Sequence, residues 1–150
     1  MAKAEKNGAD DREKKSEEMQ RMYLELQMLD GKMKQIQQQM QMLATQAEEL
    51  EGVMQSLDDF KGLTAGAETL VPLASGIFAK TTLADTKEVL VNVGSNVVTV
   101  KGVDEARAML AAQQSEIRKV HEEFAGQLQN LAHKSEETAT ELQKFIQEPE

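Results

Sequence analysis

The chain has 150 residues, a length that suits one modest domain or one long, thin element. Aromatic residues make up only 3% and cysteine is absent, which argues against a wide core, a disulfide framework and cysteine-based redox or metal chemistry. A formal net charge of −9 repels phosphate groups, so neither nucleic acid nor an anionic membrane is an expected partner. The first twenty residues hold no apolar run of signal-peptide length, and no run of about 18 apolar residues occurs anywhere, so we expect no export signal, no membrane span and a cytoplasmic location.

Residues 1–15 are polar, and we predict a disordered extension there, followed by a coiled-coil helix over residues 16–62. In that helix the apolar residues step alternately by three and by four, which is the spacing of a heptad seam. The seam positions are Met19, Met22, Leu26, Leu29, Met33, Ile36, Met40, Leu43, Ala47, Leu50, Met54 and Leu57. The pattern predicts one long helix that buries a single stripe.

Residues 63–103 have a β pattern, with short strands predicted over residues 68–73, 77–83, 88–93 and 96–101. Gly76 and Gly94 lie between strands, where hairpin turns need glycine. Pro72 implies that its strand has a free N–H side at that point. Two hairpins and a four-stranded meander fit the pattern equally well.

This β region carries more apolar residues than one solvated sheet face explains, and short strands leave open edges. We therefore predict an oligomerisation region whose strands join a β-barrel closed between subunits. The alternative is a sheet that folds back on the base of its own helices. The predicted assembly residues are Leu70, Val71, Leu73, Ile77, Phe78, Val89, Leu90, Val91, Val93, Val97, Val98 and Val100.

A second coiled-coil helix is predicted over residues 104–147, with Asp104 as its N-cap and residues 148–150 as a tail. Two successive four-residue steps, from Val120 to Phe124 to Leu128, predict a local change of winding. The apolar stripe is expected at Leu110, Ile117, Val120, Phe124, Leu128, Leu131, Leu142 and Phe145.

The two helices have matching lengths, which favours an antiparallel pair within one chain. If Leu57 lies level with Leu110, Met19 comes near Glu148 and both apolar stripes end together. The alternative is that each helix pairs with another chain in a long parallel bundle. The predicted fold is mainly α: an antiparallel coiled-coil hairpin with two central β-hairpins, four strands in all, that join an intersubunit β-barrel.

No enzyme chemistry is indicated. His121 begins a sequence like that of a zinc-protease helix, but Ala125 stands where the second histidine belongs, so we expect His121 and His133 on a solvated face. No glycine loop for a nucleotide is present, and paired carboxylates on an exposed helix point in different directions. We therefore predict no catalytic residue, no metal site and no cofactor.

The predicted helix hairpin has a free tip, where the beginning of the first helix meets the end of the second. The tip carries more apolar residues than the seam alone requires. The tip residues are Met19, Met22, Tyr23, Leu24, Met28, Leu142, Phe145 and Ile146. Leu24, Met28 and Ile146 lie off the main stripe, which favours binding of a partner, and flexible methionine suits varied apolar partners. For Met19, Met22 and Leu142, completion of the coiled coil explains the pattern equally well.

The sequence resembles the alpha-type subunit of prefoldin, of the archaeal kind, through residues 70–78 (LVPLASGIF), residues 89–94 (VLVNVG) and residues 104–106 (DEA). The resemblance implies a heterohexamer of two alpha-type and four beta-type subunits joined by a β-barrel. It also implies an ATP-independent chaperone that holds non-native proteins with its coiled-coil tips and passes them to a group II chaperonin. The alternative function is a scaffold or spacer subunit whose tips dock one specific partner.

Overall fold

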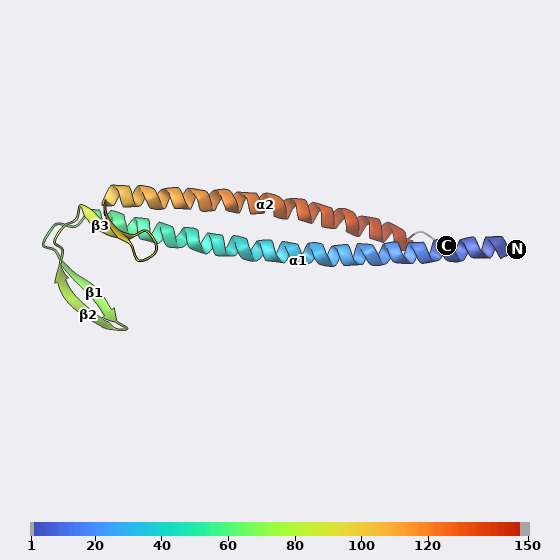
Figure 1. Ribbon diagram of the computed structural model, residues 1–150, viewed down its shortest axis with the longest axis horizontal. Coiled ribbons are helices and arrows are strands. Elements are labelled where there is room, and N and C mark those ends of the chain that lie inside the picture. Colours follow the sequence, from blue (N-terminus) through green and yellow to red (C-terminus); the bar gives the residue numbers. More distant parts are fainter. Residues whose placement is uncertain (1, 148–150) are drawn as a thin grey trace. The chain divides into compact units, whose positions relative to one another are not determined.

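The computed structural model describes residues 2–147, with side chains described from residue 8 onward. The chain divides into two compact units. The terminal unit contains Met1–Met42 and Val120–Glu150, and the central unit contains Leu43–Lys119. The elements in chain order are α1 (Ala2–Lys61), β1 (Glu68–Ala74), β2 (Ile77–Thr82), β3 (Glu88–Asn92), β4 (Val98–Gly102) and α2 (Val103–Gln147) (Figure 1).

The heptad seam predicted for α1 is confirmed. All twelve seam positions are buried or half-buried, whereas the residues between them are mostly exposed. Leu29 and Met54, each 4% exposed, are the most deeply buried of the twelve. A seam between two helices has no third layer to cover it, so many seam side chains stay only half-buried.

In the terminal unit, the two helical segments pair in antiparallel directions. Lys134 of α2 donates to Glu25 of α1, with 2.8 Å between Nζ and Oε1. Further along α1, Ile36 shares a hollow with Phe124 and Leu131 of α2. Moving forward along α1 therefore means moving backward along α2, as the sequence predicts.

The structure differs from the predicted disordered extension, because α1 begins at Ala2 and residues 2–15 are helical. Alanine, lysine and glutamate favour a helix even without an apolar stripe. An ion pair between Asp10 and Lys14, one turn apart at 2.8 Å, adds support. The predicted tail, residues 148–150, lies outside the described residues.

The central unit has the same antiparallel pairing, held by polar contacts between the helices. Arg107 of α2 binds Asp58 of α1, with 2.8 Å between Nε and Oδ1. The side-chain amide of Gln114 donates to Glu51 Oε2 at 2.8 Å and to the Ala47 carbonyl oxygen at 3.3 Å. These contacts fix which turns of the two helices lie side by side.

The start of α2 corrects the predicted N-cap. The helix begins at Val103, whose N–H donates to the Lys87 carbonyl oxygen at 3.0 Å, so Asp104 lies within the first turn. Its carboxylate instead accepts from Lys61 at the end of α1, at 2.7 Å. A carboxylate in the first turn also favours the helix through the helix dipole.

The apolar stripe of α2 was misplaced at one position. Val120 is 37% exposed, whereas His121, predicted to lie on a solvated face, is half-buried. The seam therefore runs from Ile117 to His121 to Phe124 in regular steps of four and three residues. Two successive four-residue steps occur instead from Ala106 to Leu110 to Gln114. The buried and half-buried positions along the seam of α2 are Val103, Ala106, Leu110, Gln114, Ile117, His121, Phe124, Leu128, Leu131, Ser135, Thr138, Leu142 and Phe145.

The strands form two separate antiparallel hairpins and not a meander. β1 pairs with β2 from Glu68↔Thr82 to Ala74↔Ile77, with an irregularity between Pro72 and Ala74. β3 pairs with β4 from Glu88↔Gly102 to Asn92↔Val98. The first turn uses Gly76 at φ 78°, which favours glycine.

The β3–β4 hairpin folds back on the helices of its own unit. Val89 and Val91 share one face of the hairpin, are half-buried and line a hollow with Leu57 of α1 and with Ala106 and Leu110 of α2. One face of this hairpin therefore packs on the base of the helices. The hollow also places Leu57 and Leu110 at the same level, as predicted.

The β1–β2 hairpin has exposed apolar side chains on both faces. Leu70 and Phe78 lie on one face and Val71 on the other, with exposed fractions between 44% and 63%. A two-stranded hairpin that exposes both faces has little stability of its own in water. In the single chain, this hairpin is left without a cover.

Candidate functional site

The described side chains form no cluster of metal ligands. Among the side chains of residues 8–147, no three His, Asp or Glu come together as metal ligands. No helix in this part of the chain has the length and apolar character needed to cross a membrane. The unusual features are instead two groups of exposed apolar side chains, one in each unit.

In the terminal unit, the structure divides the eight predicted tip residues into three sets. Met22 and Leu142 are buried and belong to the seam. Met19 and Phe145 are half-buried beside them. Tyr23, Leu24, Met28 and Ile146 are exposed, with exposed fractions between 52% and 58%. The exposed set contains all three residues that the sequence places off the main stripe.

Leu24 and Met28 lie side by side on α1 and line one hollow, the stripe hollow. Arg21 and Lys32 line it on α1 as well, and Lys134 lines it from α2. Glu25 also lines it and accepts from Lys134, whose pKa is raised by this hydrogen bond and by the charge of Glu25. The stripe hollow is thus an apolar surface with cationic borders.

A second tip hollow lies where α2 ends. Ile146 and Phe145 of α2 line it together with Met19 of α1. Lys15 and Arg12 line it on the N-terminal side of Met19, at the next two seam positions of α1. On the N-terminal side of Met19, the seam positions of α1 therefore carry cations in place of apolar residues.

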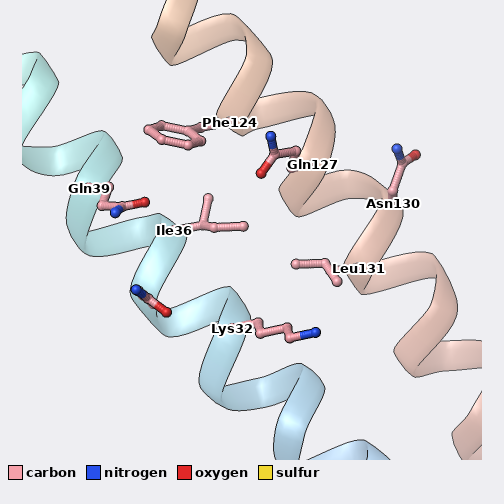
Figure 2. A pocket seen from close by; sticks show the side chains of 8 residues that line it. Lys32, Ile36, Gln39, Phe124, Gln127, Asn130 and Leu131 are labelled. Atoms are coloured by element: carbon pink, nitrogen blue, oxygen red, sulfur yellow. The ribbon is translucent and has the colours of Figure 1, made fainter.

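Between Met28 and Met42 the terminal unit has a different character. Figure 2 shows Ile36 and Leu131 pointing toward one another across the helix pair, with Phe124 beside them. The rim of this hollow carries amides, including Gln39 and Gln127. Here the apolar side chains complete the seam, and none of these three is counted among the exposed apolar residues.

In the central unit, ten of the twelve predicted assembly residues are exposed, and Val89 and Val91 are half-buried. Leu90 at 73% and Leu73 at 69% are the most exposed of the set. Exposed apolar groups of this density are characteristic of interaction surfaces. The exposed members are Leu70, Val71, Leu73, Ile77, Phe78, Leu90, Val93, Val97, Val98 and Val100.

The sequence reasoning did not identify the cations around the stripe hollow. Arg21 precedes Leu24 by three positions and Lys32 follows Met28 by four, so both lie on the helix face of the apolar pair. This spacing was the available signal. Met42 is also 64% exposed and off the seam, but it lies far from the tip residues along α1 and is not part of this surface.

Comparison with known proteins identifies the family. The family model described as "Prefoldin subunit" matches residues 29–148. The chain is 31% identical to prefoldin subunit alpha of Methanobrevibacter smithii, over 65% of this chain and 66% of that protein. It is 32% identical to prefoldin subunit alpha of Methanopyrus kandleri, over 74% of each chain. For the protein of the same name from Pyrococcus horikoshii, the identity is 26% over 88% of this chain and 90% of that one.

A solved structure has the same fold. A chain of the filamentous PFD of Methanocaldococcus jannaschii, determined by cryo-EM, aligns with a TM-score of 0.71 and 18% identity. The alignment covers 78% of this chain and 97% of that chain. From the family model and the alpha-type relatives, the chain belongs to the prefoldin subunit family as an alpha-type subunit, a non-enzymatic, chaperone-type component of a larger assembly.

Proposed function

We propose that this subunit acts in an ATP-independent holdase, which binds non-native proteins in the cytoplasm through the exposed tip residues and transfers them to a group II chaperonin. The proposal extends family membership, which supports a chaperone-type subunit, to a particular site and activity. The observation that carries it is the exposure of Leu24, Met28 and Ile146 beside a seam that is already complete.

The position of these side chains supports binding of unfolded chains. An apolar residue on the seam stabilises the helix pair, whereas Leu24, at 58% exposed, contributes little to that packing. A non-native protein exposes apolar side chains that folding would bury, and contact with Leu24, Met28 and Ile146 removes apolar area from water on both partners. Methionine is flexible enough to pack against varied shapes.

The strands supply the proposed means of assembly. The β1–β2 hairpin exposes apolar groups on both faces, and β3–β4 exposes Leu90 and Val100 on the face opposite Val89 and Val91. Pairing with strands of other subunits would cover these groups and remove the open edges. We propose a β-barrel shared with beta-type subunits, in an assembly of two alpha-type and four beta-type chains.

Assembly makes weak tips effective. One tip offers a client only a few apolar side chains, so its affinity alone is low. Several tips on one platform raise the effective concentration and hence the avidity for a long unfolded chain. Release then requires no nucleotide, because a client that folds, or that a chaperonin captures, withdraws the apolar surface being held.

The second candidate function is a scaffold or spacer subunit whose tips dock one specific partner. The contacts of Arg107 and Gln114 between the helices favour a rigid helix pair, which is what a spacer requires. The two candidates differ in the range of proteins bound. A holdase binds many unrelated unfolded chains, whereas a scaffold binds one folded partner.

Aggregation assays separate the two candidates. The assembled protein, without nucleotide, is mixed in stoichiometric amounts with several unrelated proteins diluted from denaturant, and light scattering is followed. A holdase keeps most of them in solution, and native mass spectrometry with and without a beta-type subunit reports the assembly. Suppression for none of the proteins, or for a single one, would favour the scaffold.

A further inference from the structure

The cations around the stripe hollow indicate which client segments it prefers. Arg21, Leu24, Met28 and Lys32 succeed one another along a single face of α1, so the two exposed apolar residues have a positive charge on either side. This is unusual on a chain with a formal net charge of −9. Two cations at the ends of an apolar patch favour a ligand with carboxylates at matching positions.

The acidic groups near the hollow do not cancel these cations. Glu25, which also lines the hollow, has its charge balanced by Lys134 at 2.8 Å. Asp30 is paired with Lys34, also at 2.8 Å. Glu17 lies one turn before Arg21 on the same face, but no ion pair of the described residues joins Arg21 or Lys32 to a carboxylate. Both cations remain available to a ligand.

Screening makes the local charges decisive. At physiological salt the Debye length is about 8 Å, so charges more distant than this act weakly on a bound segment. Lys32 follows Met28 by one turn of about 5.4 Å, and Arg21 precedes Leu24 by less than one turn. A client segment on the stripe hollow therefore experiences these cations more strongly than the negative charge spread over the rest of the chain.

Helix geometry sets the spacing of the favoured carboxylates. Arg21 and Lys32 are eleven positions apart, which corresponds to about 16 Å at a rise of about 1.5 Å per residue. An extended chain rises about 3.3 Å per residue and covers that length in about five residues. A short apolar stretch of an unfolded protein, with acidic residues about five positions apart, fits the length of the hollow.

We infer that the stripe hollow is a selective client site, which takes extended apolar segments of non-native proteins that carry Asp or Glu on both sides. This inference rests on the proposed function, since it names the class of client segment held by the same tip. It also gives the tip a preference that apolar contact alone does not provide.

Peptide binding tests the inference. Three dye-labelled peptides share an apolar core with two leucines and differ only in the two flanking residues, which are Glu, Gln or Lys, five positions apart. Their affinities for the assembled full-length protein are measured by fluorescence anisotropy at low and physiological salt. Two exposed ion pairs change an affinity by about threefold to tenfold, so we expect the order Glu, Gln, Lys with a spread of that size at low salt.

Matched variants assign the preference to this hollow. The double variant Arg21→Gln, Lys32→Gln removes its two unpaired cations, and Arg118→Gln, Lys119→Gln removes the same charge from the central unit. All four side chains are exposed, and circular dichroism checks that both variants keep their helices. We expect the Glu preference to disappear in the first variant and to persist in the second.

The outcomes separate this inference from the function on which it rests. Equal binding of all three peptides, or a Glu preference that survives Arg21→Gln, Lys32→Gln, would overturn the inference while leaving client binding by the tip in place. Failure of every peptide to bind, together with failure to suppress aggregation, would remove the proposed function as well.

Discussion

Arg107 holds Asp58 through two parallel hydrogen bonds, from Nε to Oδ1 at 2.8 Å and from Nη2 to Oδ2 at 3.1 Å. Asp58 lies near the end of α1 and Arg107 near the start of α2, so this pair sets the alignment of the two helices next to the β region. The hydrogen bonds and the charge of Asp58 raise the pKa of Arg107, which stays protonated. Only a planar guanidinium provides this paired geometry.

Arg107→Lys keeps the charge but loses one of the two hydrogen bonds. We expect a small decrease in the melting temperature, because both side chains are 43% exposed and water screens the pair. Differential scanning calorimetry measures the change. Lys119→Gln, which removes a pair within α2 only, is the control. If Arg107→Lys melted at the same temperature as the parent chain, the two parallel hydrogen bonds of the guanidinium would not stabilise the helix pair.

Gln114 is the buried polar residue of the seam in the central unit. Its amide donates to Glu51 and to the Ala47 carbonyl oxygen, and the small side chain of Ala47 occupies the neighbouring seam position. Gln114→Ala removes both bonds, and we expect the free energy of unfolding to decrease by about 1–2 kcal/mol. Urea unfolding measures it. Gln113→Ala, exposed on the same turn, should be nearly neutral, and equal effects of the two changes would contradict this role.

Glycine-to-alanine changes should have opposite signs in the helix and in the hairpin. At Gly52, within α1, a new Cβ meets no atom within 4 Å, so Gly52→Ala should stabilise the chain by about 0.5–1 kcal/mol. Gly76 has φ 78°, where a Cβ is strained, so Gly76→Ala should destabilise it by about 1 kcal/mol. Urea unfolding compares the two, and changes of the same sign would refute this account of the β1–β2 turn.

The Glu25–Lys134 pair gives the terminal unit a pH dependence. Because the pair raises the pKa of Lys134 in the folded state, its contribution is complete below the unfolded pKa and is lost as pH rises through the folded pKa. Lys134→Gln should therefore lower the melting temperature near neutral pH, and the difference from the parent should begin to shrink above the unfolded pKa of roughly 10.4 and vanish once pH exceeds the folded pKa. Lys144→Gln controls for net charge. A difference that persists in strong alkali would contradict the assignment.

The sequence predicted most of the helical architecture because one physical signal dominates it. From Met19 to Leu57, every step of three or four residues leads to another apolar side chain, and each proves buried or half-buried. The same rule failed at Val120, because tracing by hydrophobicity chose valine over the adjacent His121. A polar residue can be assigned to a seam only from its contacts with the partner helix, as the hydrogen bonds of Gln114 to α1 illustrate.

The β region and the start of α1 show where sequence reasoning stops. The strand positions and turns follow from β-branched residues and glycine, but the packing of Val89 and Val91 against the helices depends on contacts between distant segments. Residues 2–15 lack an apolar stripe, so only their helix propensity argues for the helix observed there. The spacing of Arg21 and Lys32 is present in the sequence, but the position of Lys134 beside Leu24 and Met28 depends on the pairing of α2 with α1.

The central claim is that exposed apolar side chains at the tip hold non-native proteins. The most direct measurement compares aggregation suppression by the assembled parent protein with that of the triple variant Leu24→Ser, Met28→Ser, Ile146→Ser and of the control Met42→Ser, which removes an apolar side chain at least as exposed elsewhere on α1. The account predicts that the triple variant assembles normally but suppresses aggregation several-fold less, while Met42→Ser behaves as the parent does. Full suppression by an assembled triple variant would contradict it.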